Sequence, residues 1–349
     1  MIFFFDGNTV WRRKYAEALA RRRGDTVIVS PRSRGMSRAA SPDRREEDMP
    51  VWMPPGWAGR LSWASFPYLK ARAERRAASR GQGLDAAFFT SPHYLPLARS
   101  LGRDTRIVYY CSDDYRSYAG WGGAGMVAQE RELCRLAYRS VFVSEALRRR
   151  AVEEYGLDPD ATLVSPNATE PRFAATGDDG RDLLAGLARP AFGAVGMFND
   201  RIDIGFLDRL AQEPALGSLV LVGPLEGVVE QRPALERLLS RPKVKAFGRQ
   251  PHEAIHRWMA ALDVAVIPYR ATPLNHFCSP MRLYDHLAVG HPIIATPHCA
   301  QIAERGDLIV ADAETAGAAA GAAAERAERG RRPVMETWDD RVRVLAGCL

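Results

Sequence analysis

The sequence predicts an α/β protein with two doubly wound domains, each a parallel sheet covered by helices on both faces. Its 349 residues exceed one ordinary domain and suit two domains of about 150–180 residues. Short apolar runs alternate with segments of helical periodicity in both halves, which is typical of a parallel sheet. Between residues 171 and 187, turn-forming residues interrupt this periodicity, which indicates a linker.

The N-terminal half opens on a strand at residues 2–5, a turn at 6–9 and a helix at about 10–22. Further strands are expected wherever four or five apolar residues are followed by turn residues, at 26–30, 86–90, 107–110 and 140–144. Residues 32–55 are rich in Arg, Ser, Pro and acidic residues, so we expect a long loop there.

The C-terminal half repeats the pattern. Strands are expected at 191–195, 218–222, 244–247, 264–268, 292–296 and 308–311, and helices at 204–212, 234–240, 252–261, 281–289 and 316–324. The chain should end on an amphipathic helix that starts at Trp338. Ligands of doubly wound sheets bind at the carboxyl ends of the strands, so we expect the two domains to face a cleft at these ends.

Composition excludes several classes of protein. No apolar run approaches the ~20 residues of a membrane-spanning helix, and Met1–Phe5 is too short for the core of a signal peptide. The five cysteines are odd in number and form no C-x-x-C pair, which argues against a disulfide framework or a cysteine zinc site. These features predict a cytoplasmic protein. The absence of G-x-G-x-x-G after the first strand, and of a P-loop, disfavours dinucleotide redox and P-loop chemistry.

Positive charge gathers in the N-terminal half. Residues 1–175 hold 28 Lys and Arg against 20 Asp and Glu (+8), whereas residues 176–349 hold 20 against 22 (−2). A basic half favours a polyanionic or membrane-surface partner. Five aromatic residues precede a basic segment at 70–76, namely Trp52, Trp57, Trp63, Phe66 and Tyr68. Two interpretations stay open: a membrane-interface surface, or a core-packing insertion with a solvated basic face. The aromatics are not interleaved with basic residues, which disfavours nucleic-acid binding.

The most informative segment is 275–296. Ser279 and Pro280 stand where a helix would begin, so backbone N–H groups and the positive end of the helix dipole would face a ligand. Arg282 follows in the first turn, and Asp285 lies three residues on, on the same helix face. A cation for a diphosphate and a carboxylate for ribose hydroxyls, one turn apart, suit a nucleotide-sugar site. A capped helix with a solvated Arg282–Asp285 pair fits the same spacing.

The run S-P-M-R-L-Y-D-H-L-A-V-G-H-P-I-I-A-T at 279–296 resembles the donor-site helix of GT-B glycosyltransferases, especially the GT4-like bacterial group. Other segments resemble that group in the same order: V-Y-Y-C-S-D-D-Y at 108–115, F-G-A-V-G-M-F at 192–198, L-V-L-V-G-P at 219–224 and V-K-A-F-G-R at 244–249. The resemblance implies an acceptor-binding domain at 1–172, a donor-binding domain at 188–334, and a last helix at 335–349 that packs back onto the first domain.

The resemblance also implies roles for individual residues. The implied donor-site residues are Gly196, Met197, Arg201, Gly223, Pro224, Gly248, Arg249, Ser279, Pro280, Met281, Arg282 and Asp285. Arg282 would neutralise the departing diphosphate, and Asp285 would bind the ribose. On the acceptor side the implied residues are Asp6, Gly7, Asn8 and His93. For His93, a purely structural role is the alternative.

Some positions depart from the family pattern. Arg282 replaces the usual Lys, Asp285 replaces the usual Glu, and Phe277 stands where the first Glu of an E-x7-E motif is expected. Tyr138 stands where the family usually has Asp. Losing that first Glu weakens the case for a retaining mechanism.

Asp113 and Asp114 are the catalytic candidates that accompany Arg282. They follow an apolar strand directly, which places them at its carboxyl end, where one carboxylate could deprotonate an acceptor hydroxyl. The alternative is that they cap the helix that follows.

The sequence therefore predicts a glycosyltransferase that moves a sugar from a UDP- or GDP-sugar to a hydroxyl acceptor. A lipid-linked saccharide, a polysaccharide precursor and a small molecule are all compatible acceptors. We expect no required cofactor and no metal site, with the nucleotide sugar as substrate, and a location in the cytoplasm that includes the inner face of the plasma membrane. A nucleotide-sugar epimerase and a non-catalytic partner subunit are the alternatives.

Overall fold

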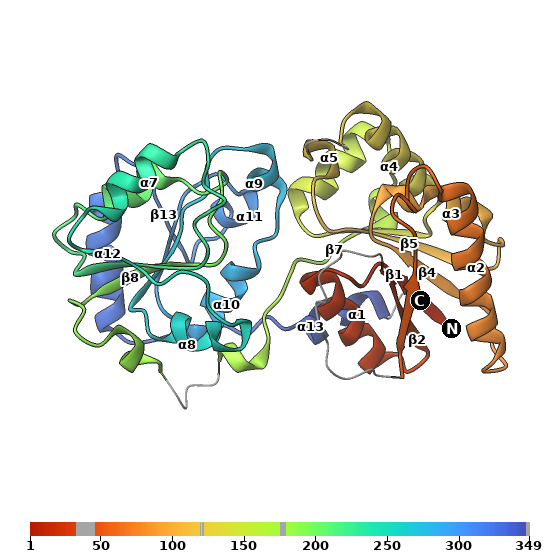
Figure 1. Ribbon diagram of the computed structural model, residues 1–349, viewed down its shortest axis with the longest axis horizontal. Helices are drawn as coiled ribbons and strands as arrows, with labels where there is room; N and C mark the ends of the chain where they lie inside the picture. Colours follow the sequence, from red (N-terminus) through yellow and green to blue (C-terminus); the bar gives the residue numbers. More distant parts are fainter. Residues whose placement is uncertain (33–45, 119, 121, 175–178, 347–349) are drawn as a thin grey trace. The chain divides into compact units, whose positions relative to one another are not determined.

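The computed structural model describes residues 1–32, 46–118, 120, 122–174 and 179–346. The chain forms two compact units. The first holds Met1–Asn167 and the C-terminal segment that starts at Trp338, and the second holds Ala168–Thr337. Each unit has one parallel sheet with helices packed on it (Figure 1), so the doubly wound architecture predicted from the sequence is confirmed in both.

The sheet of the first unit has seven strands in the order β3-β2-β1-β4-β5-β6-β7. The strands are β1 (Ile2–Phe5), β2 (Thr26–Arg32), β3 (Asp48–Trp52), β4 (Ala86–Phe89), β5 (Arg106–Cys111), β6 (Arg139–Phe142) and β7 (Thr162–Val164). The strand order reverses between β1 and β4. In an open α/β sheet this reversal is the point where ligands bind, beyond the carboxyl ends of the strands.

Strand β1 forms because its four residues are all apolar and all buried, as a strand covered on both faces requires. Its Phe4 stacks on Phe88 of β4, with ring centroids 5.6 Å apart. The helices of this unit are α1 (Val10–Arg22), α2 (Ser62–Ala78), α3 (Leu95–Ser100), α4 (Ala124–Leu136), α5 (Glu145–Tyr155) and α13 (Trp338–Ala346).

Helix α13 belongs to the first unit although it ends the described chain. It packs along α1 (Figure 1) and buries Val342 and Leu345. The Ser165 hydroxyl donates to the carbonyl oxygen of Arg341 over 3.4 Å. The apolar face of this helix therefore completes the core of the unit that the N-terminus begins.

The sheet of the second unit has six strands in the order β10-β9-β8-β11-β12-β13, with the reversal between β8 and β11. The strands are β8 (Ala191–Val195), β9 (Ser218–Val222), β10 (Val244–Ala246), β11 (Val264–Ile267), β12 (Ile293–Ala295) and β13 (Ile309–Val310). The helices are α6 (Ile204–Leu210), α7 (Arg232–Leu239), α8 (Ile255–Ala260), α9 (Pro273–Phe277), α10 (Met281–Val289), α11 (Ala300–Ala303) and α12 (Ala316–Glu328).

Three details differ from the sequence-based expectations. The predicted loop at 32–55 contains β3, whose Met49 and Val51 are buried; residues 33–45 of that loop lie outside the described part of the chain. Pro50 is tolerated because β3 is an edge strand. Strand β7, only three residues long, was not predicted. The first unit ends at Asn167, because Thr169 pairs with Thr337 of the second unit instead.

Among the helices in the described ranges, none combines the length and the hydropathy that crossing a bilayer requires.

Candidate active site

Two guanidinium groups each lie near the same aromatic ring in the second unit. Tyr269 follows the carboxyl end of β11, and its ring centroid lies 5.6 Å from Cζ of Arg282 and 6.0 Å from Cζ of Arg201. Both distances are within the range of cation–π attraction. Burial raises the pKa of Tyr269 to about 12, although both arginines act in the opposite direction. The phenol therefore stays neutral, and positive charge is concentrated at this edge of the sheet.

Arg201 is held in place by Asn275, a fully buried residue of α9. Arg201 donates through Nε to Asn275 Oδ1 over 2.8 Å and through Nη2 to the carbonyl oxygen of Leu274 over 3.1 Å. Asn275 in turn donates through Nδ2 to the carbonyl oxygens of Arg201 and Arg270, over 2.9 and 2.8 Å. One amide thus fixes both the backbone and the side chain of Arg201.

The loops after β8, β9 and β10 are hydrogen-bonded to one another. The amide of Gly196 donates to Val222 O over 2.9 Å, and that of Gly223 donates to Gly248 O over 2.8 Å. A Cβ on Gly223 would lie 1.9 Å from the carbonyl oxygen of Gly196, and one on Gly196 would lie 2.8 Å from Nη2 of Arg282. Both glycines also have φ values of +128° or more, which disfavour any side chain. The edge beside Arg282 is therefore built from backbone alone.

The other predicted donor-site residues lie along the same strand ends. Half-buried Arg282 donates to the carbonyl oxygen of Met197 over 3.5 Å. Pro224 O accepts from Phe198 N over 3.1 Å, and Arg249 is exposed beyond β10. Helix α10 begins at Met281, directly after Ser279 and Pro280, and its N-cap residue Pro280 makes no side-chain capping hydrogen bond.

Asp285 is buried rather than solvated, with 7% of its surface exposed. Its Oδ1 accepts a hydrogen bond of 2.8 Å from the hydroxyl of Thr169. Desolvation raises the pKa of Asp285 to about 7. Within the described residues, Asp285 and Arg282 do not form the solvated pair that their spacing alone allows; Arg282 contacts Met197 and Tyr269 instead.

In the first unit, a polar network joins three strand ends. Asp6 follows β1, and its carboxylate forms an ion pair with Arg12 of α1. Arg12 donates through Nη2 to the hydroxyl of Tyr115 over 2.8 Å and through Nε to Ser112 Oγ, just after β5, over 3.2 Å. Thr90, just after β4, contacts both the Asp6 carboxylate and the Tyr115 hydroxyl. The charge of Arg12 is therefore balanced by the carboxylate of Asp6.

The remaining acceptor-side residues surround this network. Asn8 donates through Nδ2 to Asp6 Oδ1 over 3.1 Å and to Pro31 O over 2.8 Å, and the amide of Gly7 donates to Val29 O over 3.1 Å. Burial lowers the pKa of half-buried His93, and Asp6 opposes this shift. The imidazole is consequently neutral near pH 7.

Asp113 and Asp114 have different surroundings. Asp114 is 1% exposed, and its carboxylate accepts from Arg150 over 2.7 Å and from the Ser117 hydroxyl over 2.5 Å. Asp113 is half-buried and accepts from the Tyr118 hydroxyl over 2.5 Å and from the Asp114 amide over 2.9 Å. Neither carboxylate makes the side-chain cap of the short helix at Tyr115–Ser117. Asp114 is thus committed to an internal ion pair, whereas Asp113 is more accessible.

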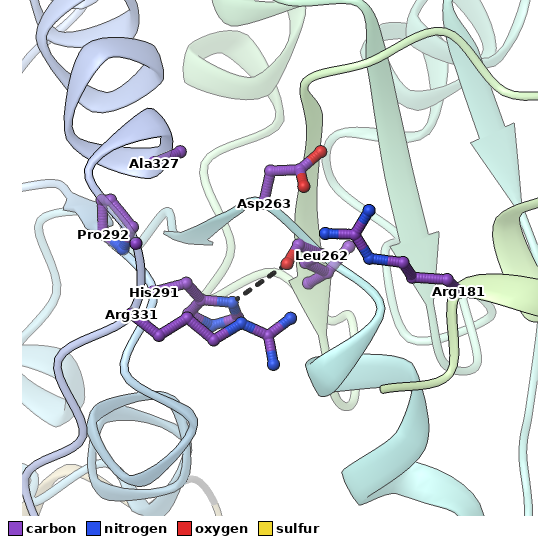
Figure 2. A pocket seen from close by; sticks show the side chains of 8 residues that line it. Arg181, Leu262, Asp263, His291, Pro292, Ala327 and Arg331 are labelled. Atoms are coloured by element: carbon purple, nitrogen blue, oxygen red, sulfur yellow. Dashed lines mark hydrogen bonds between the residues drawn. The ribbon is translucent and has the colours of Figure 1, made fainter. Parts of the chain in front are cut away.

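A cavity of about 120 Å³ lies at the opposite edge of the second sheet, where β11 and β12 begin. Arg181, Asp263, His291 and Arg331 contribute to its lining, and His291 approaches Leu262 O at 3.4 Å (Figure 2). The cavity includes none of the predicted site residues. Within the described ranges, no three His, Cys, Asp or Glu side chains are grouped as metal ligands would be.

Comparison with known proteins gives the family. The pattern of the "Glycosyl transferase 4-like domain" matches residues 7–168, and that of "Glycosyl transferases group 1" matches residues 191–326. The chain belongs to the GT4-like glycosyltransferases. Among curated relatives of this glycosyltransferase is the putative teichuronic acid biosynthesis glycosyltransferase TuaH of Bacillus subtilis, 21% identical over 220 residues. That match covers 60% of this chain and only about half (54%) of the relative.

Solved structures agree on the GT-B fold. HepE of Anabaena, in complex with UDP and glucose, superposes with a TM-score of 0.70 at 16% identity, covering 99% of this chain and 94% of HepE. A glycosyltransferase from Rickettsia africae superposes with a TM-score of 0.69 at 11% identity, covering 99% and 97% of the two chains. The expected GT-B architecture of two Rossmann-like domains is therefore confirmed.

The sequence analysis missed several residues of the arrangements around Tyr269 and around Arg12. Tyr269 follows a predicted strand, so the rule that strand ends carry ligand sites would have found it. Asn275 and Thr169 gave no local signal, because their role comes from partners distant in sequence. Arg12 lies in a predicted helix, where nothing in the local sequence distinguishes it from an ordinary solvated arginine.

Asp285 makes folding stability depend on pH. Because its pKa rises from 3.8 to about 7 on folding, the folded protein holds a proton there that the unfolded chain has lost. Stability therefore falls as the pH rises from about 4 to 7. Asp285→Asn removes this titration and keeps an acceptor for Thr169. Between pH 5 and pH 8 we expect the variant to lose about 2–3 kcal/mol less unfolding free energy than the wild type, measured by urea denaturation.

Glu325→Gln, at an exposed position of α12, is the matched control and should keep the wild-type pH profile. Burial lowers the pKa of His286 and His291, and their titration cancels because all three proteins share it. An unchanged pH dependence in Asp285→Asn would show that the carboxyl is ionised normally.

Proposed function

We propose that this glycosyltransferase transfers a sugar from a nucleoside diphosphate sugar, such as a UDP- or GDP-sugar, to a hydroxyl acceptor. The observation that carries the proposal is the convergence of Arg201 and Arg282 on Tyr269, next to the backbone-only edge at Gly196 and Gly223. Two cations beside a surface without side chains suit a diphosphate, which is compact and carries several negative charges.

In this proposal the arginines act on the leaving group. Cleavage of the bond between sugar and diphosphate adds negative charge to the departing oxygen, and preorganised guanidinium groups stabilise that charge more in the transition state than in the ground state. Arg201 is already fixed by Asn275, so little reorganisation is needed. The amides at the start of α10, from Ser279 to Met281, would bind a phosphate oxygen. We expect no cofactor to be required.

We assign the nucleoside to the neighbouring loops. Gly223–Pro224 and Gly248–Arg249 would flank the base. Asp285 would accept from a ribose hydroxyl through Oδ2, since Thr169 occupies Oδ1 and no hydrogen bond joins Oδ2 to another described residue. Its raised pKa makes this contact sensitive to pH near neutrality.

We place acceptor activation in the first unit. Asp113 would take the proton from the acceptor hydroxyl, because the Asp114 carboxylate is committed to Arg150 and Ser117. Asp6, Gly7, Asn8 and His93 would contact the acceptor from the ends of β1 and β4.

We further propose that α2 contacts an anionic membrane, which suits a lipid-linked acceptor at the cytoplasmic face of a membrane. Arg72, Arg75 and Arg76 line a recess of about 360 Å³ together with residues 48–50 of β3. Trp52 at the end of β3 is 69% exposed, and Tyr68 on α2 is 48% exposed. Exposed aromatics beside several cations are typical of interfacial binding.

Arg282→Ala tests the donor site. Removing a charged hydrogen-bond donor costs about 1.5–3 kcal/mol, so we expect the affinity for UDP or GDP, measured by calorimetry, to fall about 10- to 100-fold. Arg326→Ala, at an exposed position of α12, should bind normally. Equal nucleotide affinity in Arg282→Ala and wild type would refute the proposed donor site. Conversion of a donor sugar without any acceptor would instead indicate an epimerase.

Asp113→Asn tests the proposed base. With the donor identified by calorimetry and p-nitrophenyl glycosides as acceptors, we expect kcat to fall about 10²- to 10⁴-fold. The affinity for the nucleotide should stay unchanged, since Asp113 lies in the first unit. Asp104→Asn, an exposed carboxylate of the same unit, serves as control. A wild-type kcat in Asp113→Asn would remove this residue from the mechanism.

Vesicle sedimentation tests membrane contact. We expect binding to vesicles that contain phosphatidylglycerol, weaker binding at high salt, and none to pure phosphatidylcholine. Each Arg near an anionic surface contributes about 1 kcal/mol, so Arg72→Gln with Arg75→Gln should weaken binding about tenfold or more. The pair Arg22→Gln and Arg103→Gln, both exposed, removes the same charge elsewhere. An equal loss in the two double variants would mean that only net charge matters.

A further inference from the structure

Two buried thiols face each other beside the proposed donor site. Cys278 follows α9 and Cys299 immediately precedes α11, and their sulfur atoms lie 4.0 Å apart. Cys278 is 8% exposed and Cys299 is fully buried. We infer that Cys278 and Cys299 form a redox-active dithiol that hydrogen peroxide converts to a disulfide. This modification site is additional to the proposed transfer reaction.

The local geometry directs the two sulfurs toward one another. The Cys278 thiol approaches Asn275 O at 3.2 Å as well as the sulfur of Cys299, and the Cys299 thiol approaches Cys278 O at 3.6 Å. A disulfide requires a sulfur separation of about 2.05 Å, so the sulfurs must approach by about 2 Å. We expect side-chain rotation, together with a small shift of the segment between α9 and α10, to supply this movement.

Cys299 is a better candidate for the attacking thiolate than Cys111 or Cys134. Its pKa is lowered, first by the hydrogen bond from the Cys278 thiol and then by the amides of Ile302 and Gln301, while burial opposes the shift. By contrast, burial raises the pKa of Cys111 and of Cys134. Because the thiolate is the reactive form, those two cysteines are built-in controls.

The reaction balances with hydrogen peroxide as the oxidant. The Cys299 thiolate attacks one peroxide oxygen, the O–O bond breaks, and hydroxide leaves, so that Cys299 becomes a sulfenic acid. The Cys278 sulfur then attacks the sulfenic sulfur and displaces a second hydroxide. The two thiol protons convert both hydroxides to water, so two thiols and one peroxide give one disulfide and two waters. Burial of both sulfurs favours this small oxidant over glutathione disulfide.

The disulfide would act on the segment that supports both donor-site arginines. Asn275, which holds Arg201, lies three residues before Cys278, and α10, which carries Arg282, begins three residues after it. We therefore expect the oxidised protein to bind UDP more weakly. This consequence rests on the proposed function, whereas disulfide formation does not.

Peptide mapping tests the dithiol. The protein is prepared with the substitution Cys348→Ser, so that this cysteine, which lies outside the described part of the chain, cannot contribute a cross-link. It is treated with hydrogen peroxide, alkylated with N-ethylmaleimide, unfolded, alkylated again and cut with trypsin. Cleavage after Arg270, Arg282 and Arg305 separates Cys278, in peptide 271–282, from Cys299, in peptide 283–305. We expect one cross-linked pair of these peptides, released by dithiothreitol, while Cys111 and Cys134 are alkylated.

The variants Cys278→Ser and Cys299→Ser should lose the cross-link and keep the wild-type circular dichroism. Absence of the cross-link from the wild type, or equal oxidation of Cys111 and Cys134, overturns the proposal. A mapped cross-link with unchanged UDP affinity overturns the coupling to the donor site. If UDP does not bind the reduced protein, the proposed function fails, and the mapped disulfide still supports the dithiol.

Discussion

The proposed donor site of this glycosyltransferase depends on two like charges held near one aromatic ring. Arg201 and Arg282 both lie within cation–π distance of the same buried ring, where their like charges repel each other. The face of Tyr269 offsets part of that repulsion, and Asn275 fixes Arg201 through hydrogen bonds to its side chain and backbone. An anion bound beside both guanidinium groups would relieve the repulsion that remains, which supports the proposed diphosphate site.

In both units arginines lie at the carboxyl ends of the strands, but their electrostatic surroundings differ. Beyond β1 and β4, Arg12 is balanced by Asp6 and bonded to Tyr115, so that network is polar with little net charge. Beyond β8 and β11, Arg201 and Arg282 donate to the Asn275 side-chain amide and to backbone carbonyl oxygens. The excess of arginine in the N-terminal half is therefore not in its strand-end network; part of it lies on α2, at Arg72 and Arg75. Net charge per half of the chain does not locate the anion site.

The predicted local structure around the candidate site was most accurate where a short contiguous segment sets the geometry. The start of α10 at Met281 and the tight turns at Gly196 and Gly223 follow from local sequence, because a helix end or a turn involves only neighbouring residues. The environment of Asp285 could not be predicted, since its partner Thr169 is 116 residues away. Asp113 and Asp114 are adjacent in sequence, and only the fold shows that Asp114 is paired with Arg150 whereas Asp113 is more accessible.

By itself, the sequence determined where most strands and most helices lie, because a fully buried strand is a short run of apolar residues; β3 and β7, which are only partly buried, gave no such run. It also determined the family, through motifs whose order spans both halves. Only the tertiary structure decided which distant side chains meet, as in the Asp285–Thr169 hydrogen bond, the Arg12–Tyr115 contact and the approach of Cys278 to Cys299. Such contacts depend on strand order and register, which bring together residues that local patterns treat as unrelated.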